Sequence, residues 1–136
     1  MKTASEIEDW IYSNLVKSPV KTLLKGSIYR EGTRPVNSKK EDAVIAVVAG
    51  LDGQYSTGVV HINVFVDYID FGAGELGKNV KRCKVIEKAL LDFRLNLPIG
   101  EYWVNPNSQE TVKTYNLDEQ KLSYVHCKIN YRLSTI

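Results

Sequence analysis

The chain has 136 residues, of which 43% are hydrophobic, and its 18 basic and 16 acidic side chains leave a net charge of +2. This length and composition fit one domain spanning residues 1–136 with a single buried core. The small net charge and a pI near 8.5 do not by themselves indicate a nucleic-acid-binding protein, for which a pI above about 9 and clustered basic residues are typical.

The N-terminus, the apolar runs and the cysteines indicate the compartment. Residues 1–10, MKTASEIEDW, lack the apolar core of a signal peptide. The apolar runs are far shorter than the ~20 residues of a membrane-spanning helix. Cys83 and Cys127 lie far apart in the sequence, which favours two free, buried thiols in a reducing compartment. We therefore expect a soluble intracellular protein without membrane contacts.

The chain begins with a predicted helix. Residues 5–17 carry apolar side chains at helical spacing, and Ser5 is the expected N-cap because acidic residues follow it. Pro19 ends this helix, since the residue before a proline is disfavoured in the helical conformation. Residues 20–25 are ambiguous and allow a second short turn.

Three strands are expected next, at residues 27–30, 43–49 and 54–67. The strand at 43–49 is apolar on both alternating faces, which predicts an interior strand covered on both sides. A hairpin connection is expected at 50–53. Residues 68–77 contain three glycines and two acids, which favour a flexible loop.

A second helix is expected at about 77–96. Its predicted buried face consists of Leu76, Val80, Cys83, Ile86, Leu90, Phe93 and Leu97. Its predicted solvated face consists of Lys78, Lys81, Arg82, Lys84 and Lys88. Pro98, Ile99 and Gly100 break the helix, and three strands follow at 102–105, 110–116 and 121–133, separated by turns at 105–108 and 116–119.

This element order predicts the fold class. Few pairs of strands are separated by a helix, so the strands are expected to pair mainly with their neighbours along the chain. The sequence therefore predicts an α+β fold, with a mainly antiparallel sheet of about five to six strands and two helices packed on one face.

No pattern in the sequence indicates catalysis, a cofactor or a metal site. A zinc site needs about four closely spaced ligands, and the adjacent His126 and Cys127 point to opposite faces of a strand. The glycine-rich stretch 71–77, FGAGELG, does not have the residue spacing of the P-loop or of the dinucleotide-binding G-x-G-x-x-G motif. Glu75 would also repel a phosphate. We expect a protein that is not an enzyme and needs no cofactor.

Two polar patterns remain open to more than one interpretation. One face of the last strand carries Tyr124, His126, Lys128, Asn130 and Arg132, and a half-apolar face of the long strand carries His61 and Asn63. Such a face is either solvated or covered by another copy of the chain. A third interpretation is a nucleic-acid platform, although aromatic residues are sparse here for that role. The stretch 33–42, TRPVNSKKED, is an exposed connector or a contact loop.

Three segments carry a resemblance to a known group of proteins: GSIYREGTRPVNSKKEDAVIAVVAG, GVVHINVFV and YVHCKINYRL. Over residues 7–133 the chain resembles small proteins of phages and integrated phage-like elements of gut Bacteroidetes. That group is similar to the tail-completion and head–tail joining proteins, including neck and tail-terminator proteins, of long-tailed phages. This chain departs from the group at His61, where an asparagine is expected.

The resemblance implies a structural ring subunit. About six copies would surround the DNA exit path between portal and tail tube, joined by sheet edges and by the loops 34–42 and 68–77, which would be mobile in the free subunit. The partners would be other copies, portal, adaptor or tail-tube proteins, and DNA passing close by in the lumen. The host cytoplasm and then the virion would be its locations. The alternative is a small binding module, associated with nucleic acid through the basic face of the last strand. The expected interface residues are Arg34, Asn37, Ser38, Lys39, Lys40, Glu41, Asp42, His61, Asn63, Glu75, His126, Lys128 and Arg132.

Overall fold

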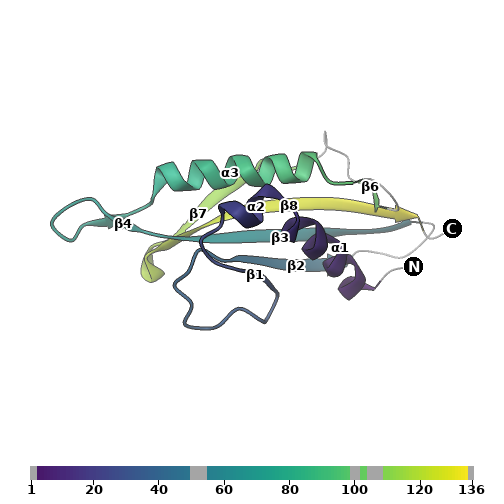
Figure 1. Ribbon diagram of the computed structural model, residues 1–136, viewed down its shortest axis with the longest axis horizontal. Helices are drawn as coiled ribbons and strands as arrows, with labels where there is room; N and C mark the ends of the chain where they lie inside the picture. Colours follow the sequence, from purple (N-terminus) through teal and green to yellow (C-terminus); the bar gives the residue numbers. More distant parts are fainter. Residues whose placement is uncertain (1–2, 50–54, 99–101, 104–108, 135–136) are drawn as a thin grey trace.

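A mixed, mostly antiparallel sheet carries three described helices on one face (Figure 1). The computed structural model describes residues 3–49, 55–98, 102–103 and 109–134. The predicted α+β class with helices on one face is confirmed. In chain order the elements are α1 (Ala4–Val16), α2 (Pro19–Leu23), β1 (Ile28–Arg30), β2 (Ala43–Ala49), β3 (Tyr55–Asp67), β4 (Ile69–Asp70), β5 (Leu76–Gly77), α3 (Val80–Leu95), β6 (Tyr102–Trp103), β7 (Lys113–Leu117), the 3₁₀ turn η2 (Asp118–Gln120) and β8 (Leu122–Ser134).

The main sheet has six strands in the order β1-β2-β3-β8-β6, with β7 also paired to β8. Strand β1 is parallel to β2, whereas the other pairs are antiparallel. The long ladder between β3 and β8 runs from Tyr55 opposite Ser134 to Asp67 opposite Leu122. The predicted connections at 50–53 and 105–108, and most of the predicted helix break at 98–100, lie outside the described residues.

Side-chain caps set the starts of the first two helices. Thr3, rather than the predicted Ser5, caps α1 in a capping box with Glu6, in which each residue accepts a hydrogen bond from the other's backbone N–H. The ambiguous stretch after Pro19 forms α2, because Ser18 accepts a hydrogen bond from Val20 N–H and Pro19 occupies the first turn.

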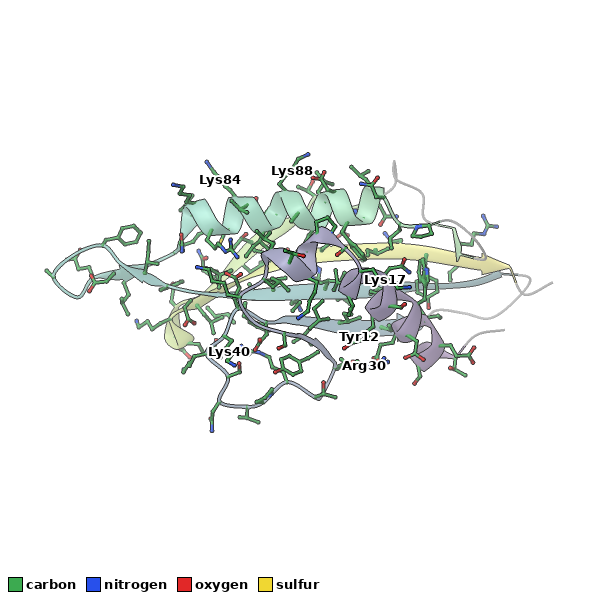
Figure 2. The ribbon with its side chains drawn as sticks, viewed as in Figure 1. Tyr12, Lys17, Arg30, Lys40, Lys84 and Lys88 are labelled. Carbon is green, nitrogen blue, oxygen red and sulfur yellow. The ribbon has the colours of Figure 1, made fainter. Side chains whose placement is uncertain are left out.

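The third helix begins later than its hydrophobic pattern predicts. Asn79 caps α3 by accepting a hydrogen bond from Arg82 N–H. Leu76 and Val80, predicted to be buried, are 48% and 49% exposed because they lie before and at the first turn of the helix. The other residues of the predicted buried face, from Cys83 to Leu97, are buried and that prediction is confirmed. Lys84 and Lys88 point outward from this helix (Figure 2).

The core lies between the helices and one face of the sheet. Val60, Ile62 and Val64 of β3 are fully buried there, opposite Ile129, Cys127 and Val125 of β8. Both cysteines are free and buried, as predicted. Strand β2 is interior, but the prediction that both of its faces are covered is wrong: Val48 is 55% exposed, and all three described helices lie on the opposite side.

Side chains occupy the outer edge of β8 between its pairings with β6 and β7. The Gln109 side chain accepts a hydrogen bond from Asn130 N–H (2.8 Å) and donates one to the Asn130 carbonyl (3.2 Å). The buried Arg94 of α3 donates to the carbonyls of Lys128 and Glu110, each at 2.9 Å. The amide of Gln109 therefore takes the place of a strand backbone at this position.

The stretch 68–77, predicted to be a flexible loop, contains the two-stranded β4–β5 hairpin, which projects from one end of the sheet (Figure 1). Positive φ angles at Gly72, Ala73 and Gly74 make its turn. Within the described residues, no helix is long and apolar enough to cross a membrane.

Candidate interaction surfaces

The face of the sheet opposite the helices is the largest candidate site, and we call it the open face. Its members alternate along the strands with the buried core residues and are brought together by the register of β2, β3, β8 and β7. The described members include Val44, Ala46, Val48, Thr57, Val59, His61, Asn63, Phe65, Asp67, Lys113, Tyr115, Tyr124, His126, Lys128, Asn130 and Arg132.

Three aromatic rings form a row across the open face. Tyr124 lies between Phe65 of β3 and Tyr115 of β7, with ring centroids 6.3 Å and 5.3 Å away. The Arg34 guanidinium lies over the Phe65 ring at 4.2 Å, and Lys113 lies over Tyr115 at 5.2 Å. Sequence reasoning missed this row because it depends on two strand pairings, β3 with β8 and β7 with β8. Tyr124 was named on one face of the last strand, but none of the three rings was among the expected interface residues.

The two histidines of the chain meet beside this row. His61 Nδ1 lies 3.3 Å from His126 Nε2, and His126 Nδ1 lies 2.7 Å from Asn63 Oδ1. The edge of Tyr115 packs against the His126 ring. Burial lowers the pKa of His126, and the neighbouring His61 lowers it further. The fold thus unites three of the predicted site residues in one cluster.

The predicted basic residues of β8 lie at one end of the same face. Lys128 forms an ion pair with Glu110 at 3.2 Å, and Arg132 is exposed. The Lys128 pair is partly exposed, so its contribution to stability is small. Lys128 and Arg132 lie four and eight residues along β8 from Tyr124, so the cations at the aromatic row itself are Arg34 and Lys113.

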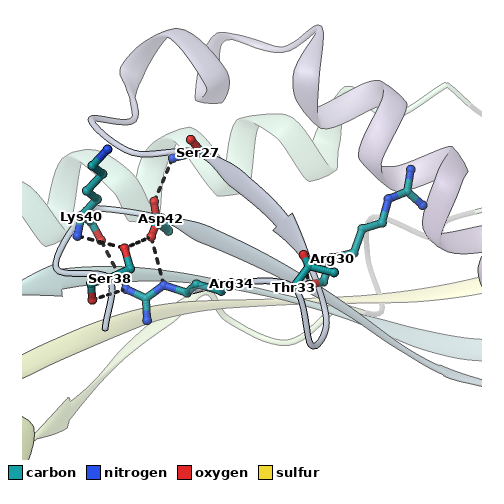
Figure 3. A network of polar contacts seen from close by, with 7 residues as sticks. All are labelled: Ser27, Arg30, Thr33, Arg34, Ser38, Lys40 and Asp42. Carbon is teal, nitrogen blue, oxygen red and sulfur yellow. Dashed lines mark hydrogen bonds and ion pairs between the residues drawn. The ribbon is translucent and has the colours of Figure 1, made fainter. Parts of the chain in front are cut away.

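The stretch 33–42 is anchored from within the subunit (Figure 3). The Asp42 side chain is fully buried and accepts hydrogen bonds from Ser27 N–H (2.9 Å), Arg34 Nε (3.0 Å) and the Ser38 hydroxyl (2.5 Å). Arg34 also donates to the carbonyls of Ser38 and Lys40. Burial raises the pKa of Asp42, but these hydrogen bonds outweigh it and the resulting pKa lies below the usual value.

A second ion pair ties the same stretch to α3. Arg82, predicted to be solvated, donates to both carboxylate oxygens of Glu41, at 2.8 Å and 2.5 Å, and to the Leu23 carbonyl. Glu41 also accepts from Lys25 N–H. A Cβ at Gly26 would clash with Asp42 and with the Glu41 backbone, so the close approach of residue 26 to these two residues requires glycine.

These contacts show which residues of the predicted interface stretch have partners inside the subunit, while the interface role of the whole stretch stays a prediction. Arg34, Ser38, Glu41 and Asp42 have partners inside the subunit that sequence reasoning did not find. The exposed side chains are those of Asn37, Lys39 and Lys40, together with Val36, which is 98% exposed.

The β4–β5 hairpin presents apolar side chains to solvent. Phe71 is 65% exposed, Leu76 48% and Ile69 39%, and the predicted interface residue Glu75 is exposed beside them. Sequence reasoning selected Glu75 for its charge and assigned Leu76 to the core, so it missed the apolar character of this protrusion.

A groove of about 600 Å³ lies between α1, α2 and α3, lined among others by Leu23, Val85 and Phe93. Its charged lining residues, Lys17, Lys88 and Asp92, are all exposed. Within the part of the chain that the structure describes, no three His, Cys, Asp or Glu side chains cluster to hold a metal ion. The open face and the hairpin are therefore the stronger candidates.

Comparison with known proteins adds no further constraint. No protein-family model matches this chain, and no curated protein matches it. The surfaces of the fold and the sequence resemblance are therefore the basis for a functional hypothesis.

Proposed function

We propose that the chain is a non-enzymatic assembly subunit of a phage or prophage, which forms a ring at the head–tail junction or at the end of the tail tube. The open face is the observation that carries this proposal. The sequence resemblance supplies the biological setting, and the open face and the hairpin supply two surfaces suited to contacts between subunits.

The composition of the open face suits a protein interface. Antiparallel sheets often leave one face in water, and such a face is usually polar. Here the described members include the row of Phe65, Tyr124 and Tyr115, together with valines and Arg132, while the acids are Asp67 at the end of β3 and Glu110, which is paired with Lys128. Interfaces are enriched in aromatic residues and arginine and depleted in acids.

A ring also needs two different surfaces on each subunit, because its contacts are heterologous and close by rotation. The hairpin, with Phe71 and Leu76 exposed, projects from the end of the sheet and differs in shape from the flat open face. A projecting apolar hairpin on one copy and an aromatic sheet face on another meet this requirement. The same proposal includes a portal or tail-tube protein as the partner, a position in one layer of the junction and a fixed number of copies in the ring.

The test is association with purified portal and tail-tube complexes from the same phage or prophage, measured by co-sedimentation and by electron microscopy of the products. We expect the wild-type chain to bind one of these complexes as a ring. Tyr124→Ser on the open face and Phe71→Ser in the hairpin should each abolish ring formation. Val85→Ser on α3, a matched exposed apolar position on the helical side, should leave it intact. Failure of the folded wild-type chain to bind either complex would overturn the proposal.

One observation favours a second function, a single-stranded nucleic-acid-binding module. Stacked bases need aromatic rings beside cationic groups, and the row of rings has Arg34 over Phe65 and Lys113 over Tyr115, while Lys128 and Arg132 follow further along β8 on the same face. Binding of a labelled oligonucleotide should then weaken as salt rises, and Lys128→Glu should weaken it further. Lys84→Glu on the helical side is the matched control (Figure 2). Equal losses in both variants would indicate non-specific charge attraction and exclude this module.

A further inference from the structure

The histidine pair has a geometry that neither proposed function uses. The chain has two histidines in all, and they are 65 positions apart in the sequence. The pairing of β3 with β8 places Asn63 opposite His126 and His61 opposite Lys128, so the two imidazoles are diagonal neighbours on the open face. Their facing nitrogens, His61 Nδ1 and His126 Nε2, are 3.3 Å apart.

The separation of these nitrogens matches the bite of a tetrahedral metal site. Two zinc–nitrogen bonds of about 2.0–2.1 Å at a tetrahedral angle place the nitrogens about 3.3–3.4 Å apart and the ring centroids about 5.2 Å apart. The observed values are 3.3 Å and 5.0 Å. The same 3.3 Å also fits an N–H···N hydrogen bond between the two rings, and the metal titration below separates the two arrangements.

Asn63 orients His126 as a ligand. Its Oδ1 accepts a hydrogen bond from His126 Nδ1 at 2.7 Å, so the proton of the neutral imidazole is on Nδ1 and the lone pair is on Nε2. Metal-binding histidines are commonly fixed in this way, with the second ring N–H donated to a carbonyl or carboxylate oxygen. The Tyr115 edge, with its ring centroid 6.1 Å from that of His126, packs against the same ring.

We propose that His61 Nδ1 and His126 Nε2 form a two-histidine clip for a divalent transition-metal ion on the open face. Imidazole suits Cu²⁺, Ni²⁺ and Zn²⁺, of which Cu²⁺ binds tightest, and it does not suit Mg²⁺ or Ca²⁺. On binding, His61 carries its proton on Nε2, and the remaining coordination positions are open to water or to another molecule. The proposal goes beyond the ring and nucleic-acid functions and does not rest on either.

The two cysteines and the nearby Glu110 should compete only weakly with the histidine pair for the metal ion. Cys83 and Cys127 are both buried in the core, and Cys127 lies on the opposite face of β8 from His126. The nearby Glu110 carboxylate is engaged by Lys128. A metal titration of the tag-free chain therefore reports on the histidine pair.

The experiment is calorimetric titration of the tag-free full chain with CuCl₂, ZnCl₂ and MgCl₂, with folding of each variant checked by circular dichroism. We expect one Cu²⁺ per chain, weaker binding of Zn²⁺ and none of Mg²⁺. His61→Gln and His126→Gln should each weaken Cu²⁺ binding at least about tenfold, because each leaves a single imidazole. Val48→Thr, an exposed position on the same face that provides no ligand and no charge, should leave the affinity within about twofold.

Variants of Asn63 test the orienting contact separately. Asn63→Ala should weaken Cu²⁺ binding about tenfold at unchanged stoichiometry, as is typical for loss of such a partner. Asn63→Asp should restore or tighten it, since a carboxylate accepts the same hydrogen bond and makes the ring more basic. The proposal is overturned if wild type binds no Cu²⁺, or if both histidine variants bind it as tightly as wild type.

Discussion

The two faces of the β3–β8 ladder share one backbone pairing but differ in what their side chains contact. On the helical face, Ile62 and Cys127 are fully buried against apolar neighbours. On the open face, one residue away along each strand, His61 and His126 contact each other at a partly exposed surface. The difference suggests that one face of each strand stabilises the fold and the other is available for binding. Substitutions at adjacent residues of one strand should therefore affect stability and binding separately.

The largest effect is expected on the helical face. Ile62→Ala should lower the free energy of unfolding by about 3 kcal/mol, because a fully buried side chain is replaced by a cavity. His61→Ala, the adjacent residue on the open face, should cost about 1 kcal/mol or less. Urea unfolding of both variants measures the difference. Equal losses would show that the open face also belongs to the core.

Substitutions in the anchored stretch 33–42 should cause the next largest loss of stability, because this stretch is held by a buried carboxylate rather than by apolar side chains. Asp42→Asn should cost about 2 kcal/mol at pH 7, since hydrogen bonds to a charged group are replaced by weaker ones. Ser38→Ala, which removes one of those donors and keeps the charge, should cost about 1 kcal/mol. A larger loss for Ser38→Ala than for Asp42→Asn in urea unfolding would contradict this ranking.

The same carboxylate makes stability depend on pH. The pKa of Asp42 is lower in the folded chain than its value of about 3.9 in the unfolded chain, so the unfolded state takes up a proton first as the pH falls. Its contribution is therefore complete above about pH 4 and is lost as the pH falls through the lower folded-state pKa. Unfolding measured from pH 6 to pH 2.5 should show a steeper loss for wild type than for Asp42→Asn. Parallel curves would rule out a depressed pKa at Asp42.

The smallest effect is expected within the aromatic row. Tyr115 and Tyr124 stack at a centroid distance of 5.3 Å, and Tyr115 is 41% exposed. A double-mutant cycle of Tyr115→Ala, Tyr124→Ala and the double variant should give a coupling energy of about 0.5–1 kcal/mol for the ring pair, with Tyr115→Phe as the control. The phenylalanine variant keeps the stacking and should be close to wild type. Zero coupling would mean that the row is a surface arrangement without mutual stabilisation.

The fold could be predicted from the sequence because hydrophobic periodicity reports burial directly. The pattern of α3 gave the correct buried stripe from Cys83 to Leu97, and the alternation in β3 and β8 gave the correct faces. The prediction of burial from hydrophobic periodicity failed at Leu76 and Val80, because the apolar pattern extends from the start of α3 back into the hairpin. It also failed for β2, because an apolar pattern on both sides does not show whether anything lies over the second face.

The candidate sites were only partly predictable, since they depend on contacts between distant segments. His61, Asn63 and His126 were selected singly, but their meeting requires the register of β3 and β8. The charged stretch at 34–42 indicated an exposed loop, whereas the Asp42 side chain is inside it, bound to Arg34 and to the backbone of Ser27. Charge alone does not distinguish a solvated carboxylate from one that holds a loop together.

The edge of β8 has a consequence for how copies of the chain can associate. An unpaired strand edge templates another strand and is a route to fibrils. Here Arg94 binds the outward carbonyl of Lys128, and Gln109 binds the outward N–H and carbonyl of Asn130. A foreign strand would first have to displace these side chains, so polymerisation by strand addition is blocked along this stretch. Along this stretch another copy would meet side chains, and such a contact can be released without opening the sheet.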